Sequence, residues 1–126
     1  HECDVISLHV PLTKETYHMV NDNFLSHFKK DIWLLNTARG PVIKTADIVK
    51  NLKTKHLLGV ALDVLEYENK ALELDISKID DNFRYLQQAD NVLLTPHVAG
   101  WTVESNIKLA EYLALKIIKL KEETLI

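Results

Sequence analysis

The sequence predicts an α/β fold in which a parallel sheet is followed by a long helix. Four short apolar runs, at residues 4–8, 31–36, 57–64 and 91–95, are separated by segments with helical or irregular patterns. Apolar strands that alternate with helices are typical of a parallel sheet with right-handed crossovers. After Thr102, apolar residues recur at helical spacing almost to the end of the chain.

The first half of the chain is expected to supply two strands and one helix. Residues 4–8 are apolar and β-branched, which favours a buried strand. The side chains of residues 21–23 can cap a helix that runs through Phe28. Residues 31–36 are expected to form a strand buried on both faces, with a turn at residues 37–41.

The second half is expected to continue the same alternation. Thr45 can cap an amphipathic helix that precedes the strand at residues 57–64. Residues 65–90 are acidic and irregular, with a short helix expected around residues 83–86. The last strand, at residues 91–95, leads toward the long helix.

Composition narrows the classes of partner and compartment. The chain of 126 residues is long enough for one domain with its own core, and 47% of its residues are hydrophobic. A net charge of −3 gives no electrostatic reason to expect nucleic acid or an anionic membrane as a partner, and no apolar run has the length of a membrane span. Cys3 is the single cysteine, which suits a reducing compartment, so a cytoplasmic location is expected. A strand-like pattern begins by Asp4 with no Met before it, so we expect a fragment of a longer protein.

Charged and titratable residues follow the expected strands. Arg39 comes after the second strand, Asp63, Glu66 and Glu68 come after the third, and His97 comes after the fourth. Ligands of an open parallel sheet bind outside the carboxyl ends of its strands. The residues are therefore candidates for a site that binds an anion and performs acid–base chemistry, and no metal is expected in it.

Each of these residues also has a structural alternative. Arg39 can be a surface residue or a salt-bridge partner, and a glutamate in an acidic loop is usually solvated. His97 follows a proline, where histidine is often a turn residue bonded to the backbone, and Asp63 can cap the turn after it. The recurrence of such residues at strand ends favours the functional interpretation.

Four blocks of sequence carry a family resemblance. They are residues 4–13 (DVISLHVPLT), 36–40 (NTARG), 62–68 (LDVLEYE) and 95–97 (TPH). In content, order and spacing they resemble the D-isomer-specific 2-hydroxyacid dehydrogenases, a family that includes D-lactate and D-3-phosphoglycerate dehydrogenases. The resemblance covers nearly the whole chain and implies the C-terminal half of a Rossmann-type, parallel-sheet NAD-binding domain that ends in a long helix.

The resemblance implies catalytic roles for three residues. Arg39 matches the arginine that binds the substrate carboxylate, for which the fork of a guanidinium is well suited. His97 matches the general acid–base that protonates the keto oxygen during reduction. Glu68, five positions after Asp63, matches the glutamate beside that histidine, and Glu66 is the less favoured candidate.

NAD is the implied cofactor, with NADP as an open alternative, and the implied substrate is a small 2-keto or D-2-hydroxy acid. Asp63 matches a position near the nicotinamide carboxamide. The other positions that are similar to cofactor contacts are Val10, Pro11, Thr37, Ala38, Arg39, His97 and Gly100. The three glycines form no G-x-G-x-x-G, so the pyrophosphate loop is absent from this sequence. We therefore expect no turnover by this chain alone.

The resemblance also divides the chain. Residues 1–101 would form the C-terminal part of the NAD-binding domain, which lacks the half with the G-x-G-x-x-G loop. Residues 102–126 would form a helix that packs toward a substrate domain absent from this sequence. The family commonly forms homodimers, so a homodimer is expected, and the isolated chain is expected to associate with itself. The residues after His97 fall between lactate-type and phosphoglycerate-type patterns and do not identify the substrate.

Two other functional interpretations stay open. Some relatives are non-catalytic, nucleotide-sensing binding or co-repressor modules on the same scaffold, and these can keep the three catalytic residues. The chain can also be an assembly domain. In the intact protein, an inert His97→Asn change would favour the binding module, whereas a large loss of NADH oxidation would favour the enzyme.

Overall fold

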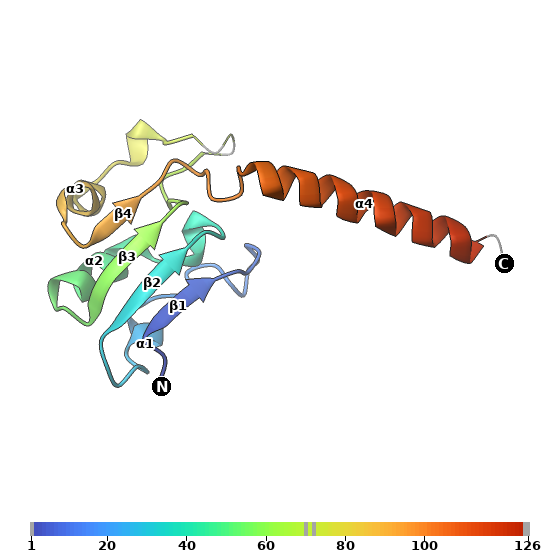
Figure 1. Ribbon diagram of the computed structural model, residues 1–126. Helices are drawn as coiled ribbons and strands as arrows, with labels where there is room; N and C mark the ends of the chain where they lie inside the picture. Colours follow the sequence, from blue (N-terminus) through green and yellow to red (C-terminus); the bar gives the residue numbers. More distant parts are fainter. Residues whose placement is uncertain (1, 70, 72, 125–126) are drawn as a thin grey trace.

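The protein is seen here as a computed structural model that describes residues 2–69, 71 and 73–124. Its elements follow one another in an α/β order (Figure 1). They are β1 (Val5–Leu8), α1 (Asp22–Leu25), β2 (Ile32–Asn36), the 3-10 turn η1 (Gly40–Val42), α2 (Thr45–Lys53), β3 (Leu57–Leu62), the 3-10 turn η2 (Ile76–Lys78), α3 (Asp81–Gln88), β4 (Val92–Leu94) and α4 (Val103–Thr124). The strands pair in parallel in the order β1-β2-β3-β4. The predicted parallel α/β fold with a long final helix is confirmed.

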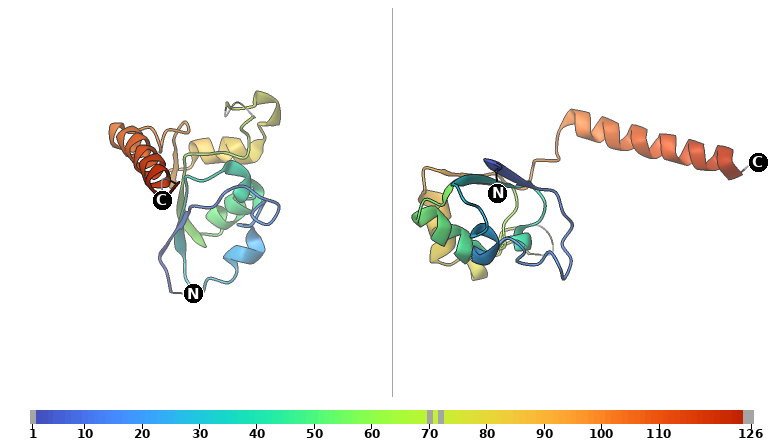
Figure 2. Two further views of the ribbon diagram at one scale, coloured as in Figure 1. Left: turned by 90° about the vertical axis from the view of Figure 1, so that its right-hand side faces the viewer. Right: turned by 90° about the horizontal axis from the view of Figure 1, so that it is seen from below.

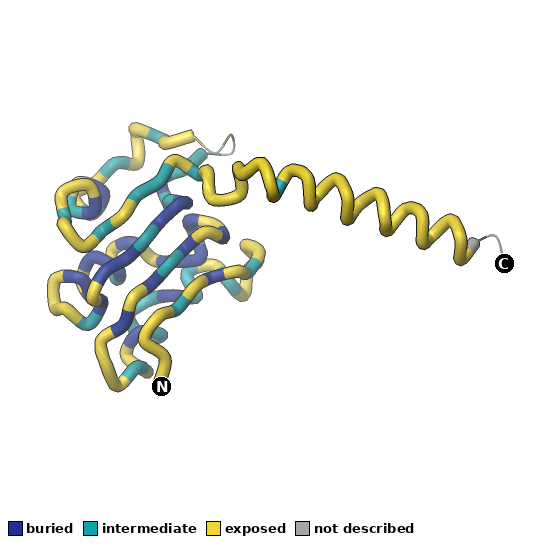
Figure 3. The backbone as a smooth tube through the Cα atoms, in the orientation of Figure 1, coloured by how far each residue is buried: buried dark blue, intermediate teal, exposed yellow. Residues whose placement is uncertain are grey.

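The hydrophobic core lies between one face of the sheet and the three shorter helices (Figures 2 and 3). Each helix contributes apolar side chains to it, among them Leu25 from α1, Ile48 from α2 and Leu86 from α3. These pack on strand residues such as Leu34 and Leu62, which are almost completely buried. Burial of apolar surface on this face is what fixes the helices against the sheet.

The expectation that the first two strands are buried is wrong. Within β2 the side chains alternate, so that Leu34 is fully buried while Trp33 is 47% exposed. In β1, which is an edge strand, Val5 is 53% exposed. Successive side chains of a strand point to opposite faces, and in the described structure α1, α2 and α3 cover one face only. The other face therefore presents apolar side chains, including those of Leu58 and Leu93.

The first helix begins where the sequence predicts but is shorter. Asn21 is its N-cap, and the side chain accepts a hydrogen bond from Phe24 N at 3.0 Å. The helix ends at Leu25, so the expected continuation to Phe28 is wrong. Phe28 still packs against the core from the segment that leads into β2.

The second helix is capped by a residue far away in the sequence. Lys44, not Thr45, occupies the N-cap position, and its side chain makes no capping hydrogen bond. The backbone N–H of Thr45 instead donates to Glu66 Oε2 at 2.9 Å. The prediction of Thr45 as the cap is therefore wrong, because a carboxylate from the loop after β3 satisfies this helix end.

The acidic segment between β3 and β4 contains the expected helix, α3. Asp80 caps it by accepting from Phe83 N at 3.0 Å, and it also accepts from the Tyr67 hydroxyl at 2.7 Å. The Tyr67 and Phe83 rings pack edge to face with centroids 5.2 Å apart. Burial, followed by the contact with the Asp80 carboxylate, raises the pKa of Tyr67. These contacts tie the loop after β3 to α3.

The last helix, α4, projects away from the sheet as a single rod (Figures 1 and 2). Thr102 Oγ1 accepts from Ser105 N at 3.0 Å and so caps the helix start. Through residue 123 its side chains are exposed, except for the half-buried Ser105 (Figure 3). Residues 125 and 126 of the segment expected at 102–126 lie outside the described residues. Within the described chain, no helix is both long and apolar enough to cross a bilayer.

Candidate active site

The carboxyl ends of β2, β3 and β4 meet at one edge of the sheet. Asn36, Leu62 and Leu94 end these strands and are aligned in register. The segments that carry Arg39, Asp63 and His97 therefore start side by side, as the sequence predicts for a parallel sheet. Open parallel sheets place their ligand sites at this edge.

His97 and Glu68 form a hydrogen-bonded pair at this edge. The imidazole Nδ1 lies 3.0 Å from Glu68 Oε2, and both side chains are largely buried. An ionised carboxylate only accepts hydrogen bonds, so Nδ1 carries the proton. In the neutral Nδ1–H tautomer the lone pair lies on Nε2, so that atom can accept a proton and, once protonated, give it back.

The backbone of His97 is held in an uncommon conformation. Its φ of 55° lies in the left-handed region. The backbone N–H donates to the carbonyl of Asp63 at 2.9 Å, so the loop after β4 is tied directly to the end of β3. Such a conformation persists only when surrounding contacts determine it, and it is often found at functional sites.

The two glutamates after β3 face different partners. Glu68 folds back over its own turn, where Oε1 accepts from Leu65 N at 2.7 Å while Oε2 faces His97. Glu66 lies 2.5 Å from His18 Nε2 and also receives the Thr45 N–H. Of the two carboxylates, only Glu68 is within hydrogen-bonding distance of His97 among the described contacts.

Asp63 binds the loop that carries His97. Its carboxylate, only 5% exposed, accepts from the Thr95 hydroxyl at 2.6 Å and from the backbone N–H groups of Val98 at 2.8 Å and Ala99 at 3.0 Å. Burial alone would raise the pKa of this carboxyl, but these hydrogen bonds and the nearby His97 outweigh burial and lower it. Asp63 is thus an ionised clamp on the His97 loop.

Arg39 is positioned by a buried asparagine. Asn36, fully buried at the end of β2, donates from Nδ2 to the carbonyl of Arg39 at 3.1 Å and accepts from Ala38 N at 3.1 Å. The Arg39 side chain is exposed, and its guanidinium donates to the carbonyl of Ala38 at 2.6 Å. Among the described contacts, no hydrogen bond or ion pair joins Arg39 to His97 or Glu68.

One cavity, of about 540 Å³, lies at His18, Thr45 and Glu66 and also reaches Glu68. Two others border His97 or Asp63. The larger, of about 520 Å³, is lined by Leu65, Glu68, Glu73, Leu74, Phe83, Leu94, Thr95, Pro96 and His97. The smaller, of about 240 Å³, lies at the ends of β2, β3 and β4 and is lined by Leu35, Thr37, Ala61, Leu62, Asp63, Leu93, Thr95, Val98 and Ala99. His97 and Glu68 both line the cavity of about 520 Å³, and the cavity of about 240 Å³ has walls that are mainly apolar.

The remaining candidate cofactor contacts are spread around this edge. Thr37 lines the smaller cavity, and the residue that follows it, Ala38, is buried. Val10 packs against the core, and the carbonyl of the exposed Pro11 accepts from the Thr16 hydroxyl at 2.7 Å. Gly100 lies in the exposed turn before α4, where its carbonyl accepts from the Ser105 hydroxyl. Val10, Pro11 and Gly100 are not among the residues that line either cavity.

Three residues, Asn36, Thr95 and His18, contribute to the site without having been singled out as site residues from the sequence. Asn36 and Thr95 lie inside the blocks quoted above, and each is bonded to a residue that was predicted: Asn36 to Arg39, and Thr95 to Asp63. Glu66 was the less favoured carboxylate, and it serves α2 instead. His18 carries no signal in the sequence, because its partner lies 48 positions away.

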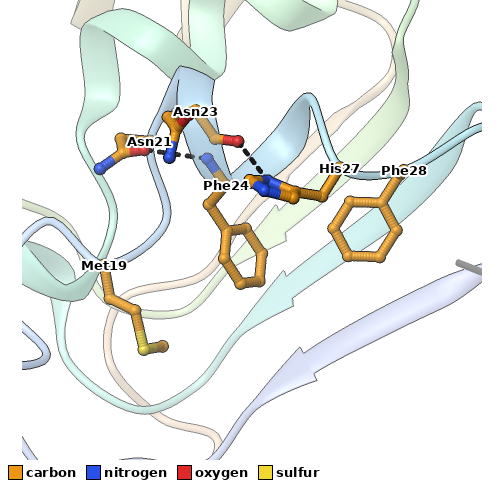
Figure 4. A pocket seen from close by; sticks show the side chains of 6 residues that line it. All are labelled: Met19, Asn21, Asn23, Phe24, His27 and Phe28. Carbon is orange, nitrogen blue, oxygen red and sulfur yellow. Dashed lines mark hydrogen bonds between the residues drawn. The ribbon is translucent and has the colours of Figure 1, made fainter.

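A separate cavity of about 480 Å³ lies at α1, away from these loops (Figure 4). Its polar groups serve the local backbone: Asn21 caps the helix, and the His27 ring Nδ1 lies 2.7 Å from the carbonyl of Asn23. Across the described residues, no group of three or more His, Cys, Asp or Glu side chains is arranged to hold a metal ion.

Comparison with known proteins identifies the family. The chain matches the family described as "D-isomer specific 2-hydroxyacid dehydrogenase, NAD binding domain" over residues 1–99. It is 44% identical to a glyoxylate reductase of Thermofilum pendens over 115 residues, which are 91% of this chain and 31% of that protein. It is also 44% identical to a D-lactate dehydrogenase of Lactiplantibacillus plantarum over 104 residues, 80% of this chain and 31% of that protein.

Solved structures agree with this match. D-lactate dehydrogenase of Lactobacillus jensenii, solved with NAD+, superposes with a TM-score of 0.73 at 33% identity, over 90% of this chain and 37% of that one. D-lactate dehydrogenase of Aquifex aeolicus, complexed with NAD and lactic acid, gives a TM-score of 0.70 at 37% identity, over 98% and 38%. The chain thus spans about a third of the length of the relatives it matches. With its fold, its strand-end residues and these similarities in agreement, the chain belongs to the NAD-binding domain family of the D-isomer-specific 2-hydroxyacid dehydrogenases.

Proposed function

We propose that this chain is part of an NAD-dependent dehydrogenase that interconverts a small 2-keto acid and a D-2-hydroxy acid. The observation that carries the proposal is the contact of His97 with Glu68 on a cavity at the carboxyl edge of the sheet. Relatives named as glyoxylate reductase and D-lactate dehydrogenase support the same reaction class.

His97 is the proposed general acid–base. With Nδ1 bonded to Glu68, its Nε2 gives a proton to the keto oxygen during reduction and takes it back during oxidation. The Glu68 carboxylate stabilises the imidazolium that donates this proton and keeps the ring in the correct tautomer. Arg39 is the proposed anchor for the substrate carboxylate, and its exposed guanidinium is free to turn from its local bond to Ala38.

The smaller cavity suits a flat, partly apolar ring such as nicotinamide. Ala61, Leu35 and Leu93 provide apolar walls, and Thr37 and Asp63 complete the lining. NAD would supply the hydride when it is bound. The sequence has no G-x-G-x-x-G, so this chain offers residues for the nicotinamide end only, and we propose that the dinucleotide phosphates are held outside these 126 residues.

The packing of the last helix and the oligomeric state of the whole enzyme belong to the same proposal. Residues 102–126 would pack on a substrate domain, which would cover the apolar side chains that α4 exposes. A homodimer is proposed for the whole enzyme.

The test uses the full-length protein that carries this chain. NADH oxidation is followed with a panel of 2-keto acids that includes glyoxylate and pyruvate, first for the wild type and then for His97→Asn. We expect a large loss of rate in the variant, because the proton donor is gone. His56→Asn is the matched control, since His56 lies 3.0 Å from the carbonyl of Leu25, away from the site. No turnover by the wild type, or an inert His97→Asn change, would favour a nucleotide-sensing binding module.

A further inference from the structure

A second histidine–carboxylate pair lies close to the first. His18 Nε2 is 2.5 Å from Glu66 Oε1, and the two side chains are 25% and 26% exposed. The His18 ring also stacks on Tyr17 with centroids 4.0 Å apart. His18 lies in the segment before α1, whereas Glu66 lies in the loop after β3, so the contact joins two distant parts of the chain.

Both oxygens of Glu66 are engaged. Oε1 faces His18, and Oε2 accepts the backbone N–H of Thr45, the first residue of α2, at 2.9 Å. The His18 backbone N–H donates to the carbonyl of Pro41 at 2.8 Å and its ring stacks on Tyr17, so this residue is itself held in place. Glu66 is therefore fixed from two directions by elements that do not belong to its own loop.

The turn that begins at Leu65 connects Glu66 to the proposed acid–base pair. Glu68 N donates to the carbonyl of Leu65 at 3.2 Å, and Leu65 N donates to Glu68 Oε1 at 2.7 Å. Glu66 lies inside this closed turn, two positions before Glu68. The turn is thus a short covalent and hydrogen-bonded connection between Glu66 and the carboxylate that faces His97.

We propose that Glu66, clamped by His18 and by the Thr45 N–H, is a positioning residue that aims Glu68 at His97. The inference rests on the proposed function, because it concerns the acid–base pair of that reaction. Glu66 does not touch the proposed reacting atoms, and its contribution passes through Glu68. A misplacement of about 1 Å at such a pair is enough for a loss of about 100-fold in rate.

The direct test observes His97 rather than activity. Imidazole nitrogen shifts of the chain, labelled at histidine with nitrogen-15, report which ring nitrogen carries the proton. We expect the Nδ1–H tautomer in the wild type, a mixture of tautomers in Glu68→Gln, and a shift toward that mixture in Glu66→Ala. Glu66→Gln introduces an amide of the same shape, whose oxygen can accept from the Thr45 N–H and whose NH2 can donate to His18, and is expected to retain the wild-type tautomer.

His18→Asn gives an independent route to the same result. Asparagine tolerates the positive φ of 51° at this position, but its shorter side chain does not reach Glu66. We expect the His97 tautomer to shift as in Glu66→Ala. His56→Asn is the matched control, since its side chain is also 25% exposed but contacts Leu25 and Asp31 instead. If Glu66→Ala does not fold, His18→Asn alone decides the outcome.

Kinetics of the full-length protein provide the second test. Glu66→Ala is expected to lower kcat by about 10- to 100-fold with little change in KM, because the proposed substrate anchor, Arg39, is not disturbed. In a Glu68→Gln background the same change is expected to cost less than about twofold, because residues that act as a unit are not additive.

The outcomes separate this inference from the proposed function. Folded Glu66→Ala and His18→Asn chains that keep the wild-type His97 tautomer would overturn the positioning role. An equal loss from Glu66→Ala with and without Glu68→Gln would overturn it as well. A wild-type protein that reduces no 2-keto acid would refute the proposed function, and the tautomer measurement would still decide whether Glu66 positions Glu68.

Discussion

Glu68 Oε2 lies 3.0 Å from the imidazole Nδ1 of His97, although 29 positions separate the two residues in the sequence. Each partner is held by a further hydrogen bond: Glu68 Oε1 accepts from Leu65 N within its own turn, and the His97 N–H donates to the carbonyl of Asp63 at the end of β3. The contact exists because the strands that precede the two loops, β3 and β4, are neighbours in the sheet. Four predictions follow from this arrangement and from the elements around it.

Glu68→Gln should remove most of the activity of the full-length enzyme. A glutamine amide can donate to the His97 ring and so allow the wrong tautomer, and it does not stabilise an imidazolium. We expect kcat to fall about 100-fold or more, measured as NADH oxidation with the best 2-keto acid. Glu73→Gln, which changes another carboxylate of the same cavity, is the control. Equal losses in the two variants would show that Glu68 has no special role.

Gly40→Ala should destabilise the fold. A Cβ atom at Gly40 would lie 2.0 Å from the backbone carbon and oxygen of Leu65, and backbone atoms have little room to move away. We expect the free energy of unfolding to drop by about 1–3 kcal/mol, the usual cost of overpacking, as measured by urea denaturation. At Gly100 an added Cβ would meet nothing within 4 Å, so Gly100→Ala should leave stability almost unchanged. Similar values for both variants would contradict the close approach at Gly40.

Asp63→Asn should destabilise the protein most at neutral pH. The Asp63 pKa is lower in the folded chain than its ordinary value of 3.8, so the ionised carboxylate stabilises the fold above that value and this contribution is lost as pH falls through the folded pKa. We expect Asp63→Asn to lower the free energy of unfolding by about 1–3 kcal/mol near neutral pH, because the amide NH2 of Asn would face buried hydrogen-bond donors. The difference from the wild type should shrink as pH falls below about 4.

Thr95→Val is the companion variant for that measurement. It removes one of the hydrogen bonds to the Asp63 carboxylate and leaves those from Val98 and Ala99. Its effect on unfolding should be smaller than that of Asp63→Asn. A stability difference for Asp63→Asn that stays constant from neutral to acid pH would contradict the lowered pKa.

Deletion of residues 102–126 should leave the sheet intact and reduce self-association. Through residue 123, α4 packs little on the rest of the chain, while Leu109, Leu113 and Leu120 are exposed on it. We expect Tm to change by less than about 4 °C, which corresponds to less than about 1 kcal/mol for a domain of this size. In sedimentation, the chain with residues 102–126 should associate and the shortened chain should be monomeric. A monomeric chain with α4 present would show that its apolar surface does not drive association.

The elements of the fold were predictable from local pattern. Apolar runs marked the four strands, Asn21 marked the start of α1, and the helical spacing after Thr102 marked α4. Burial was predicted less well, because the exposure of Trp33 depends on which face of the sheet is covered and not on the strand itself. The cap of α2 was also missed, since Glu66 is 21 positions from Thr45.

By itself, the sequence determined the fold class, the family resemblance and which residues end up at the carboxyl edge of the sheet. The order of strands and helices is enough for that, because parallel strands bring their carboxyl ends together. The resemblance also pointed to Glu68 as the carboxylate beside His97, and only the tertiary structure decided that Glu66 meets His18 and the start of α2. The physical reason is that the direction of a loop side chain is set by hydrogen bonds to residues distant in sequence, and these form only after the sheet and helices have packed.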